Sequence, residues 1–95
     1  MGFTTISSTQ LAASGSVTTN SARVKSIYVA HSAAAGTVIL RDGGSTGTAR
    51  CTINTAAAIG EYQTIIPEPG IHCKSSSGPY IAITGGVSFV TVFYD

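Results

Sequence analysis

Residues 23–42 read RVKSIYVAHSAAAGTVILRD, and this stretch decides the fold class. Two runs rich in β-branched residues, 24–30 and 37–40, flank a segment of small residues, 32–36. β-Branched residues favour strands, and a short run of Ser, Ala and Gly between two strands is typical of a chain reversal. We therefore expect a central β-hairpin here. Because apolar side chains occur on both faces of its first strand, we also expect that strand to be covered on both sides.

Short strands and turn signals continue toward the C-terminus. Residues 48–55 alternate between apolar and polar side chains, which indicates a half-buried strand. The segment before them, 42–47, contains three glycines and an Asp and predicts a turn-rich loop, while 56–60, AAAIG, predicts a connection between two sheets. Further strands are expected at 62–66 and 71–73.

The last part of the chain is the most hydrophobic. Residues 80–84 and 87–94 are both typical of strands, and Gly85 and Gly86 lie between them. Two consecutive glycines suit the tight turn of a short hairpin. We therefore predict a closing hairpin.

This pattern predicts an all-β fold, a small antiparallel β-sandwich of jelly-roll-like form with about seven to eight strands. We divide the chain into an N-terminal segment, 1–21, which forms an arm or edge strands, and a β-sandwich domain, 22–95. The N-terminal segment is rich in Ser, Thr and Ala and has only scattered apolar side chains. Since it can bury little apolar area, we expect it to contact neighbouring subunits, and we expect the domain to fold without residues 2–20.

Charge is scarce in this sequence. Only 9% of the 95 residues are charged, and five Lys and Arg against four Asp and Glu give a formal net charge of +1. Without a basic patch, nucleic acid and anionic membranes are not expected as partners. Because a surface with this few charges favours association between copies of the chain, we expect a homo-oligomer. We see no secretory signal and no apolar run of membrane-spanning length, and we expect folding in a reducing cytoplasm.

Four residues are candidates for chemistry: His31, Cys51, His72 and Cys73. His72 and Cys73 are adjacent, so in a strand they point to opposite sides and do not share one ion. Cys51 and Cys73 lack the close spacing of a metal or redox motif, and we expect two buried free thiols, with a single disulfide as the alternative. The sequence predicts no catalytic residue, no metal site and no cofactor, and hence no enzyme.

The order of several segments carries a resemblance to a known class of protein. RVKSIYVAH, TVILRDGG, TINTAAA, IIPEPGIHC and the C-terminal GPYIAITGGVSFVTVFYD follow one another over residues 22–95. This succession resembles small virion proteins of tailed phages, notably marine phages. The resemblance implies a structural protein that decorates or cements a capsid, with a tail, fibre or connector component as the alternative.

The resemblance also implies a location and partners. We expect a virion protein assembled in the host cytoplasm, whose partners are further copies of itself, with a trimer as one arrangement, and the major capsid protein or other virion proteins. Apolar and aromatic side chains are the expected interface residues: Phe3, Ile6, Leu11, Tyr28, Phe89, Phe93 and Tyr94. A glycan-binding β-sandwich remains a further alternative, because the four tyrosines, Tyr28, Tyr62, Tyr80 and Tyr94, could form a platform for sugar rings.

Overall fold

The computed structural model describes residues 6–67 and 69–95. These residues form seven β-strands and no helix, which confirms the predicted all-β class. The strands are β1 (Ser7–Leu11), β2 (Gly15–Ser16), β3 (Ala22–Asp42), β4 (Thr48–Thr55), β5 (Gly60–Ile65), β6 (Ile71–Cys73) and β7 (Pro79–Tyr94). The strand predicted at 48–55 is confirmed, as is the short strand at 71–73.

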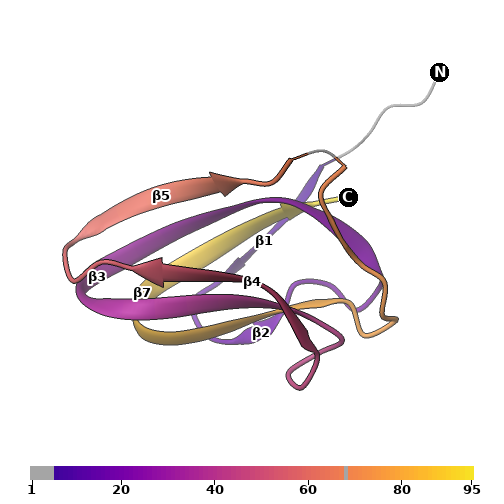
Figure 1. The fold of residues 1–95 in the computed structure, drawn as a ribbon, viewed down its shortest axis with the longest axis horizontal. Helices are drawn as coiled ribbons and strands as arrows, with labels where there is room; N and C mark the ends of the chain where they lie inside the picture. Colours follow the sequence, from indigo (N-terminus) through magenta and orange to yellow (C-terminus); the bar gives the residue numbers. More distant parts are fainter. Residues whose placement is uncertain (1–5, 68) are drawn as a thin grey trace.

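The strands form one antiparallel sheet that is folded over on itself (Figure 1). The two long strands, β3 and β7, pair along their length, from Val24 opposite Tyr94 to Asp42 opposite Pro79. On its other side β3 pairs first with β6, then with β5 and finally with β4. The second half of β7 pairs with β1 and its first half with β2.

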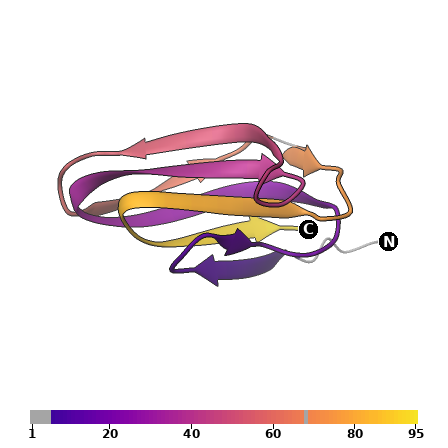
Figure 2. The same ribbon diagram turned by 90° about the horizontal axis from the view of Figure 1, so that it is seen from below.

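The fold of the sheet creates two layers. Layer A contains β5, the first half of β3, the second half of β7 and β1; layer B contains β4, the second half of β3, the first half of β7 and β2. The strands of each layer lie side by side in Figure 2. Residues 56–59 carry the chain from β4 in layer B to β5 in layer A. The connection predicted at 56–60 therefore joins two layers of one sheet, and Gly60 already belongs to β5.

Both predicted hairpins are wrong. β3 runs through residues 32–36 and β7 runs through Gly85 and Gly86 without a reversal onto themselves. Instead, the two strands turn together from one layer into the other, at the left in Figure 1; we call this the corner end. Register shifts between Ala30 and His31, and between His31 and Gly36, mark the corner in β3.

Small residues occur at the corner because the two backbones touch there. An added Cβ on Gly36 would lie 2.5 Å from the carbonyl oxygen of Thr84, and one on Gly86 would lie 2.7 Å from the carbonyl carbon of Ala34. The Ser32 hydroxyl donates a hydrogen bond to the Gly86 carbonyl oxygen at 3.0 Å. Gly and Ala are therefore needed here because the two strands approach closely. A tight turn favours the same small residues.

The core lies between the layers and is built from alternate residues of the strands. Ile27 and Val29 face it from layer A, and Val38 and Leu40 face it from layer B, all with almost no exposed surface. From β7, side chains of both halves complete it: Ile81, Val87, Val90 and Val92. Each fully buried aliphatic side chain contributes about 1.5–3 kcal/mol to folding, so this alternation is the main source of stability.

The end opposite the corner is held by Asp42. Its carboxylate accepts hydrogen bonds from the backbone N–H groups of Lys74 at 3.2 Å and Ser75 at 3.1 Å, and its Oδ2 lies 3.7 Å from Nη1 of Arg50. These contacts tie the loop between β6 and β7 to the end of β3. The turn-rich loop predicted at 42–47 follows Asp42, and Gly43 and Gly44 supply its positive φ angles, 110° and 82°.

The N-terminal segment contributes an edge strand to each layer. β1 pairs with β7 from Ser7 opposite Tyr94 to Leu11 opposite Val90, and β2 pairs with β7 through Gly15 and Ser16. Val17 is buried in the core, with 5% of its surface exposed, and its N–H donates to the Pro79 carbonyl oxygen at 2.9 Å. The separation of 1–21 from 22–95 stays a prediction.

Candidate functional site

The outer face of layer A carries a group of aromatic side chains. In β3, Ile27 and Val29 point into the core, so Tyr28 points outward. In β7, Val90 and Val92 point into the core, so Phe89 and Phe93 point outward. Register places all of these outward positions on one side of the sheet. We call this surface the aromatic face: Ser26, Tyr28 and Ala30 of β3, Phe89, Thr91 and Phe93 of β7, Glu61, Gln63 and Ile65 of β5, and Ser8 and Gln10 of β1.

Tyr28 lies at the centre of this face. Its ring centroid is 6.1 Å from that of Phe89, and the ring planes are tilted by 37°. Its hydroxyl interacts with Glu61, and this hydrogen bond, with burial and the negative charge of Glu61, raises the pKa of Tyr28. Beside it, the Gln63 amide donates a hydrogen bond to the Ser26 hydroxyl at 3.2 Å. Aromatic carbon and hydrogen-bonding groups therefore alternate across the face.

Two strongly exposed isoleucines lie in or just before β5, the strand at the margin of layer A. Ile65 at the end of β5 is 76% exposed, and Ile59, just before β5, is 83% exposed. The sequence pattern does not predict Ile65 as an interface residue, because alternation in this strand places its core-facing residues at 62, 64 and 66 and Ile65 on the other face. The register of Ile65 opposite Ser26 is what puts it on the aromatic face.

Six of the seven predicted interface residues occupy three kinds of place in the structure, and the seventh lies outside the described residues. Tyr28, Phe89 and Phe93 share the aromatic face. Ile6, 49% exposed, directly precedes β1. Leu11 and Tyr94 pack against the core, so their side chains also serve the fold. Phe3 lies outside the described residues.

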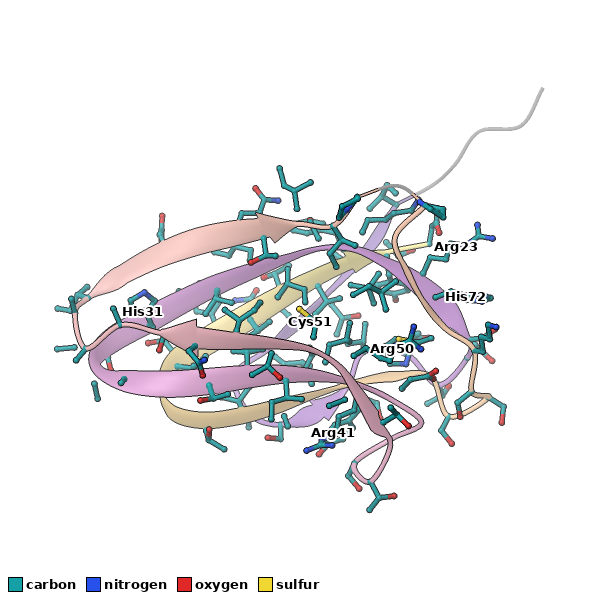
Figure 3. The ribbon with its side chains drawn as sticks, viewed as in Figure 1. Arg23, His31, Arg41, Arg50, Cys51 and His72 are labelled. Carbon is teal, nitrogen blue, oxygen red and sulfur yellow. The ribbon has the colours of Figure 1, made fainter. Side chains whose placement is uncertain are left out.

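The four candidates for chemistry are dispersed. His31 is 93% buried at the corner end, with Nδ1 3.3 Å from the Ser32 carbonyl oxygen, whereas His72 is exposed at the opposite end (Figure 3). Cys51 and Cys73 are free thiols, the first partly buried and the second fully buried. Within residues 6–67 and 69–95, no group of three His, Cys, Asp or Glu side chains could hold a metal ion.

Cys73 has a distinct electrostatic environment. Burial of the thiol, together with the nearby negative charge of Asp42, raises the pKa of Cys73 to about 11, and Arg50 opposes this shift. A thiol that stays protonated is a weak nucleophile. The part of the chain that is described shows no pocket beside it. Cys73 is therefore a core residue.

The described part of the chain contains no helix, and therefore no helix that is long and apolar enough to cross a membrane. Comparison with protein-family models, curated proteins and solved structures finds no match to this chain.

Proposed function

We propose that this protein is a structural subunit of a tailed-phage virion, which decorates or cements the capsid through contacts between subunits. The aromatic face is the observation that carries the proposal. Tyr28, Phe89 and Phe93 lie on the side of layer A that faces away from the core, so their rings are not needed to fill it. Aromatic residues are enriched where protein surfaces bind one another. The resemblance of residues 22–95 to small virion proteins supplies the virion context.

The mechanism of such a subunit is mass action. Many copies bind the assembled shell and not its separate or unfolded parts, so binding raises the stability of the assembled state. This role requires no catalysis and no cofactor. It requires a small, stable fold with a surface that can bind a partner, and the aromatic face is the surface that we propose for this contact.

Gold-labelled antibody against the protein, applied to virions of the phage that carries this sequence, tests the proposal. Label over the capsid is the expected result, and label restricted to the tail would favour the tail or connector alternative. Virions without the protein would contradict both.

Substitutions then test whether the aromatic face makes the attachment. The double variant Tyr28→Ala with Phe93→Ala should bind in a smaller amount than the wild type to virus particles from which this protein has been removed. Tyr80→Ala is the matched control, because Tyr80 is an aromatic residue of β7 whose register opposite Arg41 places it on the outer face of layer B. Equal attachment of the double variant and the control would contradict a role for the aromatic face.

A glycan-binding tail or fibre module is the second candidate. The observation that favours it is the contact of the Tyr28 ring with Phe89 on one side and its hydroxyl with Glu61 on the other. Ring faces and carboxylate acceptors side by side are what a sugar requires, since its C–H groups stack on rings and its hydroxyls donate hydrogen bonds. A glycan-array signal that disappears in Tyr28→Ala, and persists in Tyr80→Ala, would support this candidate over decoration.

A further inference from the structure

The two edges of the folded sheet differ in how they are protected from pairing. Along the described chain, β4, β5 and the three-residue strand β6 form one edge, and β1 and β2 form the other. In β4, Leu40 is opposite Cys51 and Arg41 is opposite Ala49, so Arg50 is an extra, bulged residue. β5 carries Glu61, and Pro67 and Pro69 follow it. Bulges, charges and prolines are the features by which natural sheet edges avoid joining other strands.

β1 has none of these features. Its sequence, SSTQL, contains no charged residue, no Pro and no Gly. Its register with β7 is unbroken over all five residues, from Ser7 to Leu11. Ser7, Ser8 and Gln10 are exposed, and among the described strands β1 pairs only with β7. Its outer backbone N–H and C=O groups therefore form a regular edge that a further strand can join.

We infer that β1 pairs with the β1 strand of a second copy of this chain, in antiparallel orientation across a two-fold axis. This inference rests on the proposed function and deepens it, because it names the partner of one surface of the subunit. An antiparallel strand is self-complementary: when Thr9 lies opposite Thr9 of the other copy, Ser8 lies opposite Gln10 and Ser7 lies opposite Leu11, so all five residues pair.

A second copy fits this edge better than continued growth of the sheet. Head-to-tail pairing would require the edge of β4, β5 and β6, where the Arg50 bulge and Glu61 obstruct the two longer strands and β6 has only three residues. Pairing through β1 therefore closes as a dimer. It joins the two A layers into one eight-stranded sheet, and because Ser8 is opposite Phe93 within each chain, the two aromatic faces lie on the same side.

Only five residues pair, so the contact is smaller than the roughly 800 Å² per partner of a standard stable interface. We expect a weak dimer in dilute solution. Attachment of both copies to one particle makes the β1 contact effectively intramolecular and strengthens it without new contacts.

Charge reversal tests the pairing. Ser8→Lys with Gln10→Lys places like charges opposite each other across the axis, and Ser8→Glu with Gln10→Glu does the same with the other sign. Each variant alone should dimerise at least about tenfold more weakly than the wild type in sedimentation equilibrium. An equal mixture should recover wild-type association, because Lys then lies opposite Glu. Thr48→Lys with Thr52→Lys, at exposed positions of β4, is the matched control and should leave dimerisation unchanged.

The outcomes separate this inference from the proposed function. Charge variants that are folded by circular dichroism and dimerise like the wild type overturn β1 pairing, as does a wild type that stays monomeric at high concentration. Virions that the gold-labelled antibody does not label overturn the proposed function, whether or not the isolated protein dimerises. Dissociation of both variants with recovery in the mixture supports β1 pairing even in that case.

Discussion

Gly86 shows how one residue decides whether β7 can change layers. Its φ is not in the left-handed region, so backbone conformation does not require glycine there. Space does: an added Cβ would lie 2.8 Å from Oγ of Ser32 and would meet the Ala34 carbonyl group. We predict that Gly86→Ala lowers the free energy of unfolding by about 2 to 3 kcal/mol, because backbone must move to admit the methyl group. Urea denaturation measures this change.

Gly15→Ala is the control for that prediction. Gly15 is also in a strand with an ordinary φ, but the nearest atom to its added Cβ is the flexible end of Leu11, at 3.4 Å. Its expected effect is within about 0.5 kcal/mol. Equal losses for the two variants would show that any methyl group on these strands is harmful and that the corner contact is not special.

The Cys73 thiol makes stability depend on pH in a predictable direction. The folded-state pKa of Cys73 is about 11, above the roughly 8.5 expected of an exposed thiol in an unfolded chain. Between these values the unfolded chain releases the proton and the folded chain retains it, so stability falls as pH rises, by at most about 1.4 kcal/mol per pH unit. Urea unfolding across this range should therefore show a shallower loss in Cys73→Ala than in the wild type. Identical slopes would contradict the buried, protonated thiol.

At the scale of strands, the sequence predicted which segments are extended but not how they cross between layers. β-Branched runs and alternation identified Thr48–Thr55 because those signals are local. The small residues at 32–36 and 85–86 predict turns, because a tight turn and a close approach of two backbones both require small residues. Only the pairing of residues distant in sequence, such as Gly36 with Gly85, separates the two cases.

The aromatic face was predictable in part for the same reason. Phe89 and Phe93 share a parity within one strand, so sequence alone places them on one face. The register of β3 on β7 and on β5 then brings Tyr28 beside Phe89 and Glu61. Tyr94 has the opposite parity to Phe93 and packs against the core, which separates these two neighbours by role.

Truncation tests how the N-terminal segment divides between fold and assembly. Composition alone predicts that the domain folds without residues 2–20, but the buried position of Val17 makes the two ends of this segment unequal. Removing residues 2–11 deletes β1 and the partly buried Leu11 but leaves Val17 and β2, so we expect a folded, somewhat less stable domain with weakened association. Removing 2–20 also opens the core where Val17 lies, a loss of at least about 1.5 kcal/mol in a domain of marginal stability. Thermal melts that show no difference between the two truncations would contradict this division.

At the scale of the molecule, scarce charge is also unevenly placed. His31 lies at the corner end, and the opposite end of the molecule carries Arg23, Arg50 and His72 (Figure 3). Two of the basic side chains form ion pairs within the chain: Lys25 Nζ lies 3.9 Å from Asp95 Oδ2, and Arg50 Nη1 lies 3.7 Å from Asp42 Oδ2. The aromatic face and β1 together carry one charged residue, Glu61. The surfaces proposed for contact are therefore those that can lose water with the smallest charge penalty.

This distribution predicts how association responds to salt. If copies join through β1 and apolar side chains, raising the salt concentration screens the few repulsive charges and leaves the attractive contacts intact, so the average mass should stay constant or increase. Assembly through ion pairs such as Lys25 with Asp95 exchanged between copies would respond in the opposite way, because screening weakens exposed pairs. Light scattering at one protein concentration over a salt series distinguishes the two. A mass that falls toward the monomer as salt rises would show that charge, and not the uncharged edge and aromatic face, holds the copies together.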